Sequence, residues 1–227
     1  MPHASCPNLL YLLQLVSPAL PVGAYSYSEG LETLVETKVV CNVESFKHWL
    51  IQELRYGAIR LEAAVMLRSY RAVKAKDFAT VAYWNNWLSA TRETEELRNQ
   101  SLQMGSALIR LLKELQPQVK PIITVVGNPC NYAIAFGVAA SIWEINSEAV
   151  ILGYLHSWLS NLITAGVKLI PLGQTAGQLL LINLQELIST VAAEIINLDD
   201  DELSCCSWGL SLASMNHEQQ YTRLFRS

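Results

Sequence analysis

Five charged residues between positions 92 and 98 form the densest group of side chains that could do chemistry: Arg92, Glu93, Glu95, Glu96 and Arg98. Paired carboxylates can serve as a general acid and a general base. The same spacing also suits a solvated helix turn, in which Arg92 and Glu96 pair at positions i and i+4. We favour the solvated turn, because such ion pairs are common on exposed helices. An uncharacterised helical enzyme that uses the Arg92–Arg98 cluster is the alternative.

The other candidates for chemistry lack the spacing that their reactions need. The sequence contains no GxxxxGK[ST] loop for nucleotide phosphates, and Gly209-Leu-Ser-Leu-Ala213 nearly matches a nucleophile elbow but lacks the strand before it. The histidines, at positions 3, 48, 156 and 217, form no ligand motif, and Cys205-Cys206 is more often two idle thiols than a metal site. The sequence therefore predicts no catalytic residue and no metal ligand.

Composition narrows the class of protein further. With 227 residues, 51% of them hydrophobic, the chain can bury a core without disulfides or a structural metal. A net charge of −4 and the lack of a basic stripe argue against nucleic-acid binding. Five cysteines, two of them adjacent, fit a reducing cytoplasm. Residues 149–170 are apolar but include His156 and Lys168, so we expect a buried helix and no membrane span.

Helical periodicity dominates the sequence. Leu97, Met104, Leu108, Leu111 and Leu115 line one helical face, and Pro117 and Pro121 should end that helix. Similar patterns cover residues 44–75, 77–90, 131–145, 147–170 and 174–197, with Asn42 and Asp77 placed as N-caps. Residues 122–126 are prone to form a strand but have no partner strand, so a linker or a helix start also fits. We predict an all-α, single-domain, multi-helix bundle of about eight helices.

Two irregular segments carry aromatic and apolar side chains that ordinary loops lack. Residues 17–30 contain Pro18, Pro21, Tyr25 and Tyr27, in which the prolines limit backbone freedom and the tyrosines offer apolar area with a polar tip. The tail, residues 217–227, has apolar anchors at Tyr221, Leu224 and Phe225 and cations at Arg223 and Arg226.

These features indicate surfaces that bind a partner, although either segment could instead fold back on its own domain. We expect the tail to bind a partner and to be removable without opening the core.

Four segments together resemble the UreF family of urease accessory proteins. They are SPALPVGAYSYSEGLE at residues 17–32, TRETEELR at 91–98, GVKLIPLGQ at 166–174 and HEQQYTRLFRS at 217–227. The resemblance runs in order along nearly the whole chain, and the ending QYxRLFRS is the most specific part. It implies a single UreF-like helical domain over residues 1–227.

The resemblance also implies a function and a set of partners. Members of the family are all-helical, non-catalytic maturation factors that form homodimers and help to insert nickel into urease. They bridge UreG, the GTPase that carries nickel, to UreD (also called UreH) and to the urease apoprotein. This chain alone would then bind no cofactor, because the complex handles nickel and GTP. Within the four segments we expect Glu96, Arg98, Lys168, Gln174 and His217 to bind partners, in addition to the loop and tail residues named above.

Overall fold

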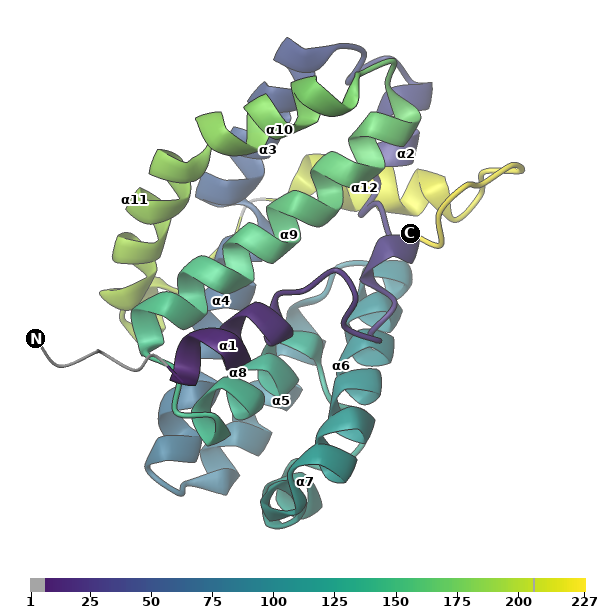
Figure 1. The fold of residues 1–227 in the computed structure, drawn as a ribbon. Coiled ribbons are helices and arrows are strands. Elements are labelled where there is room, and N and C mark those ends of the chain that lie inside the picture. Colours follow the sequence, from purple (N-terminus) through teal and green to yellow (C-terminus); the bar gives the residue numbers. More distant parts are fainter. Residues whose placement is uncertain (1–6, 206) are drawn as a thin grey trace, which may run out of the picture.

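The computed structural model describes residues 7–205 and 207–227, and every regular element in those ranges is helical (Figure 1). The prediction of an all-α fold is thus confirmed. The α-helices are α1 (Pro7–Leu15), α2 (Leu31–Glu36), α3 (Val43–Tyr56), α4 (Ala58–Lys74), α5 (Phe78–Thr91), α6 (Glu95–Leu115), α7 (Lys120–Val126), α8 (Tyr132–Ile142), α9 (Ser147–Leu169), α10 (Gln174–Asn183), α11 (Gln185–Ile196) and α12 (Trp208–His217). Three short 3-10 turns are η1 (Ala24–Ser26), η2 (Pro117–Val119) and η3 (Asp200–Glu202).

The described residues hold more helices than the eight or so predicted, because two periodic stretches are each divided. Gly57 separates α3 from α4, and a Cβ at this position would clash with the Glu53 carboxylate. Leu184 likewise separates α10 from α11. Residues 122–126 belong to helix α7 and not to a strand, since Pro121 can start a helix and Gly127, at φ +82°, ends it.

Side-chain caps fix where several helices begin. Asn42 and Ser45 form a capping box at the start of α3, and the Asp77 carboxylate accepts a hydrogen bond from the Thr80 amide at the start of α5. Both predicted N-caps are confirmed. Thr94 caps α6 by accepting from the Leu97 amide, so this helix begins after Arg92 and Glu93 rather than before them.

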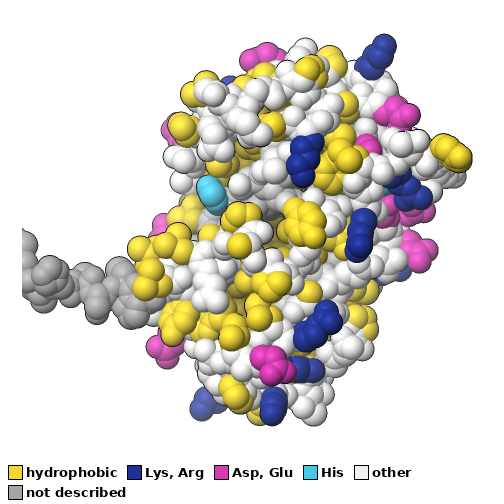
Figure 2. All heavy atoms as spheres, turned by 45° about the vertical axis from the view of Figure 1, so that its right-hand side comes forward, with side chains coloured by type: hydrophobic (Ala, Val, Ile, Leu, Met, Phe, Trp, Pro, Cys, Tyr) yellow, Lys and Arg dark blue, Asp and Glu magenta, His cyan; other side chains and the backbone are white. Residues whose placement is uncertain are grey.

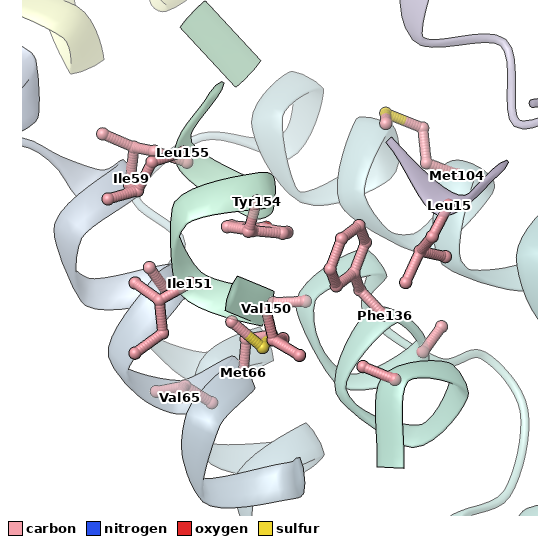
Figure 3. Close-up of a cluster of buried hydrophobic side chains, with 14 of the residues drawn as sticks. Leu15, Ile59, Val65, Met66, Met104, Phe136, Val150, Ile151, Tyr154 and Leu155 are labelled. Atoms are coloured by element: carbon pink, nitrogen blue, oxygen red, sulfur yellow. The ribbon is translucent and has the colours of Figure 1, made fainter. Parts of the chain in front are cut away.

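The core lies where α4, α8 and α9 meet. Gly137 lets α8 approach α4 closely, since a Cβ there would lie 2.5 Å from the Met66 carbonyl oxygen. Figure 3 shows Tyr154 of α9 beside Phe136 of α8, and their ring centroids are 5.0 Å apart in an edge-to-face arrangement. Leu15 and Met104 lie on the other side of Phe136 in the same view. The core therefore joins α1 and α6 to the central helices.

Helix α9 is long and apolar enough to cross a membrane, as is the bent pair α10 and α11 taken together. Half of the most apolar window of α9 is buried inside the protein. The helix crosses the molecule diagonally and packs against α4, α10 and α11 (Figure 1). Its apolar character therefore matches that of a core helix, as the interruptions by His156 and Lys168 predict.

Candidate partner-binding site

The loop (residues 17–30) and the tail (residues 217–227) lie side by side, although they occupy opposite ends of the sequence (Figure 1). The Arg226 amide donates to the Ser26 carbonyl at 2.8 Å, and the Ser28 amide donates to the Ser227 carbonyl at 2.6 Å. The Ser28 hydroxyl donates to the same Ser227 oxygen, also at 2.6 Å. We call the surface that these two segments form the loop–tail face.

The Glu32 carboxylate is one of the groups that hold the tail in place. It accepts hydrogen bonds from the Leu224 amide at 2.7 Å and the Phe225 amide at 3.0 Å. Glu32 lies in the first turn of α2, two residues after Gly30, which has a φ of +77°. A Cβ at Gly30 would lie 3.2 Å from Ala213 Cβ, so the glycine also lets α12 approach this turn. Glycine is suited to this position both by its conformation and by its size.

His217 lies between two carboxylates beneath the tail. Its Nε2 is 3.3 Å from Glu32 and its Nδ1 is 2.8 Å from Glu96. Burial alone would lower the pKa of His217, but the hydrogen bonds and charges of Glu96 and Glu32 outweigh it and raise that pKa. An imidazolium can donate from both nitrogens at once, which suits this position. The Arg223 guanidinium lies 3.4 Å from Glu96 and extends the network to the surface.

The outer side of the loop–tail face carries exposed aromatic and apolar side chains. Tyr25, Tyr221 and Leu224 have exposed fractions of 70%, 104% and 65%. Beside Tyr25 lies a shallow pocket of about 570 Å³, into which Pro21, Arg110 and Arg226 also face. Aromatic side chains combined with arginines are typical of the residues that dominate protein interfaces.

Three residues predicted to bind partners instead pack inside the protein. Tyr27, His217 and Phe225 are buried, with exposed fractions of 5%, 0% and 6%. The Tyr27 hydroxyl donates to Gln103, and the Lys168 ammonium lies 5.6 Å from the centre of the Phe225 ring. Phe225 belongs to the core, so removal of the tail would expose part of that core, contrary to the expectation that it could be removed without opening it.

The charge cluster also differs from its prediction. Arg92 is buried and pairs with Glu62 of α4, while Glu96 pairs with His217 and Arg223. The predicted Arg92–Glu96 pair is wrong, because α6 begins at Glu95 and leaves Arg92 outside the helix. The Arg98 guanidinium donates to the Arg92 carbonyl at 2.9 Å and so fixes the segment that joins α5 to α6. The cluster is thus neither a solvated turn nor one shared site.

The remaining predicted residues are exposed. Lys168 reaches the surface at the end of α9, as its position in an apolar helix predicts. Gln174 begins α10, and Pro18 lies beside a second cavity. Among the described residues, no hydrogen bond joins either of these two to the tail.

Sequence reasoning missed the residues that hold the loop–tail face together. Glu32 lies at the end of the quoted segment 17–32, yet its contacts with Leu224 and Phe225 span more than 190 positions. Gln100 of α6 accepts from the Ser227 hydroxyl and donates to Glu29. Neither role has a local sequence pattern, so neither could be found from spacing alone. In residues 7–205 and 207–227, no group of three His, Cys, Asp or Glu side chains is placed to hold a metal ion.

Comparison with known proteins gives a consistent result. A profile of the UreF family matches residues 40–185. The urease accessory protein UreF of Nostoc sp. is 66% identical over 220 residues, which cover 97% of this chain and 96% of that protein. The proteins of the same name from Synechocystis sp. and Chromohalobacter salexigens are 52% and 41% identical, over 96% and 95% of this chain and 97% and 93% of their own lengths. The chain therefore belongs to the UreF family of urease accessory proteins.

Proposed function

We propose that this protein bridges UreG to UreD and to the urease apoprotein through its loop–tail face. Family membership makes the chain a urease maturation factor and not an enzyme. The finer assignment of partners follows from the resemblance of the loop and tail segments. We further propose that the protein works in the cytoplasm as a homodimer, and that nickel and GTP are handled by the complex.

The observation that carries the proposal is the contrast between the two sides of the tail. Its inner side is fixed by Glu32, His217 and the buried Phe225 ring. Its outer side leaves Tyr221 and Leu224 exposed to solvent. A segment held rigid in this way loses little conformational freedom when a partner covers its exposed side chains. It therefore binds that partner more tightly than a mobile segment with the same side chains would.

Two exposed cations of the tail can orient a partner on this surface. Arg223 and Arg226 lie in the same segment as Tyr221 and Leu224, and both are exposed. Guanidinium groups at the rim of an interface guide acidic surfaces toward it and favour one orientation, while the apolar anchors supply most of the affinity. The arrangement supports a docking surface rather than a reaction centre.

Substitution of the two exposed anchors tests the proposal. The double change Tyr221→Ala and Leu224→Ala should weaken binding to UreD by a factor on the order of a thousand, because buried interface anchors each contribute about 2 kcal/mol. Its matched control is Tyr83→Ala with Leu115→Ala, an exposed tyrosine and an exposed leucine on α5 and α6. Co-expression with UreD and UreG, followed by purification of the complex, provides the measurement.

Melting of each variant separates docking from folding. We expect both double variants to melt close to the parent protein, since all four side chains are at least 46% exposed. Normal complex formation by the Tyr221 and Leu224 variant would refute the loop–tail face as the docking surface. Equal loss of binding in the control variant would do the same.

A further inference from the structure

Glu29 has its carboxylate at the wall of a cavity. Its carboxylate accepts hydrogen bonds from Gln100 Nε2 at 2.9 Å and from Trp158 Nε1 at 2.8 Å, and both donors are neutral. Among the residues that the structure describes, it forms no ion pair. Its φ of +54° is one that few residues other than glycine adopt. The loop thus holds this carboxylate in place against a local conformational cost.

The neighbouring carboxylate, Glu62, already has a cationic partner. The Arg92 guanidinium pairs with it, and the Tyr154 hydroxyl donates to it at 2.9 Å. All three side chains line the same cavity as Glu29. The cavity wall therefore holds two carboxylates and one guanidinium, and this guanidinium forms its ion pair with Glu62. One guanidinium charge thus faces two carboxylates that are removed from water, so the site favours an incoming cation.

The rest of the wall is suited to an organic cation. The cavity has a volume of about 370 Å³, and much of its lining is apolar or aromatic, including Leu20, Tyr132, Tyr154 and Trp158. Aromatic rings attract ammonium and guanidinium groups, and the aliphatic side chains match an alkyl stem. A ligand with an apolar stem and a charged head satisfies both features at once.

The mouth of the cavity continues into an exposed apolar patch. Leu13 of α1 lines the cavity and has an exposed fraction of 55%, and Leu9 and Leu10 on the same helix are 51% and 70% exposed. Figure 2 shows hydrophobic side chains gathered on the surface next to the start of this helix. A free small molecule would leave this patch uncovered, whereas a protein surface would bury it.

We propose that this cavity receives a lysine or arginine side chain of a protein partner, whose charged head pairs with Glu29. The site lies on the inner side of the loop and does not depend on which proteins bind the loop–tail face. Burial first, and the charge of Glu62 second, raise the pKa of Glu29 to about 7. A cation that binds here displaces the proton that Glu29 partly retains at neutral pH. The other titratable groups that line the cavity are Glu62 of α4, Arg92 before α6, Tyr132 of α8, and Tyr154 and His156 of α9.

Titration of the full-length protein with side-chain analogues tests the proposal. n-Butylammonium and n-butylguanidinium should change the fluorescence of Trp158, which contacts Glu29, and Trp158→Phe should remove that change. Glu29→Gln should weaken binding of both cations by at least about ten-fold, while Glu36→Gln, at an exposed position of α2, should leave it unchanged. Binding to the parent protein should tighten between pH 6 and pH 8, and this pH dependence should vanish in Glu29→Gln.

Blocked tripeptides identify the source of the cation. Acetyl-Ala-Lys-Ala-amide should bind with the same dependence on Glu29, and the norleucine analogue should bind at least about ten-fold more weakly. Equal affinity for n-butylammonium and n-butanol would overturn the proposal, as would equal affinity of the parent and the Glu29→Gln variant. Binding of free amines but not of the lysine peptide would overturn it in favour of a small-molecule site. A response to Ni²⁺ alone would overturn it in favour of a metal site.

Discussion

At the scale of single residues, Glu32 joins three positions that lie far from it in the sequence. One carboxylate accepts two tail amides and lies within hydrogen-bond distance of His217. Each of these contacts joins positions at least 185 apart in the sequence. The sequence shows Glu32 only as the last residue of a recognisable segment, because nothing in local spacing indicates such distant partners.

Glu32→Gln should loosen the tail without unfolding the helices. The amide keeps one acceptor oxygen but loses the charge that holds two backbone amides and the His217 ring, which should cost about 3 kcal/mol of stability. Chemical denaturation measures the loss, and hydrogen exchange at the Leu224 and Phe225 amides should rise by more than that at the core of α4. Glu36→Gln on the same helix is the control. Unchanged exchange at these two amides would contradict the role given to Glu32.

The dependence of stability on pH should also come from a few buried residues. Burial raises the pKa of Glu53 to about 7, with the charges of Glu29 and Glu93 as further causes, and Glu29 is raised to a similar value. The pKa of His217 is raised as well. In each case the folded state holds a proton that the unfolded chain releases at lower pH, so stability falls as pH rises from about 5 to 8.

Urea denaturation at pH 5.5 and pH 8 measures this fall, to which Glu53 alone should contribute about 2 kcal/mol. The variant Glu53→Gln should lose that share, while the exposed Glu44→Gln on the same helix should keep it. Greater stability of the parent protein at pH 8 than at pH 5.5 would refute the assignment.

At the scale of elements, the helices follow from periodicity and caps, whereas the tail does not. The spacing from Leu97 to Leu115 predicts α6, and Asn42 and Asp77 cap α3 and α5 as their positions suggest. Residues 217–227 carry the same kinds of side chain whether they contact a partner or the protein itself. The burial of Phe225 and its hydrogen bond to Glu32, together with the backbone hydrogen bonds between tail and loop, distinguish the two cases.

Deletion of residues 217–227 should therefore reduce stability as well as binding. The truncated chain loses three buried residues, His217, Phe225 and Ser227, and leaves Glu32 without its tail partners. A buried phenylalanine alone contributes about 3 kcal/mol or more, so the melting temperature should fall by several degrees. Leu224→Ala, at an exposed position, should melt like the parent. Equal melting of the truncated and parent chains would show that the tail does not support the fold.

At the scale of the whole molecule, exposed apolar side chains predict self-association. Besides those of α1, the exposed apolar side chains include Leu179 and Ile182 on α10 and Trp208 and Leu212 on α12. Such side chains could form the apolar centre of an interface between two copies of this chain. Composition indicates this in advance, since only 16% of residues are charged, but it cannot say which helices are exposed.

Light scattering of the isolated protein at micromolar concentration should give about twice the chain mass of 25.3 kDa. Circular dichroism should show a helical spectrum without a strand component. A mass that stays at that of a single chain over this concentration range would contradict the dimer. The spectrum serves as the control, because it shows whether the sample is folded.

The pairing of the loop with the tail sets an order on how this protein matures. A ribosome makes the loop at the beginning of synthesis and the tail only after α1 to α12. Ser26, Ser28 and Glu32 must therefore wait for their partners until every helix has been made. An unfinished chain therefore lacks the loop–tail face, since half of that face is made only after α12. The face is thus a property of the folded helical body and not of the nascent chain.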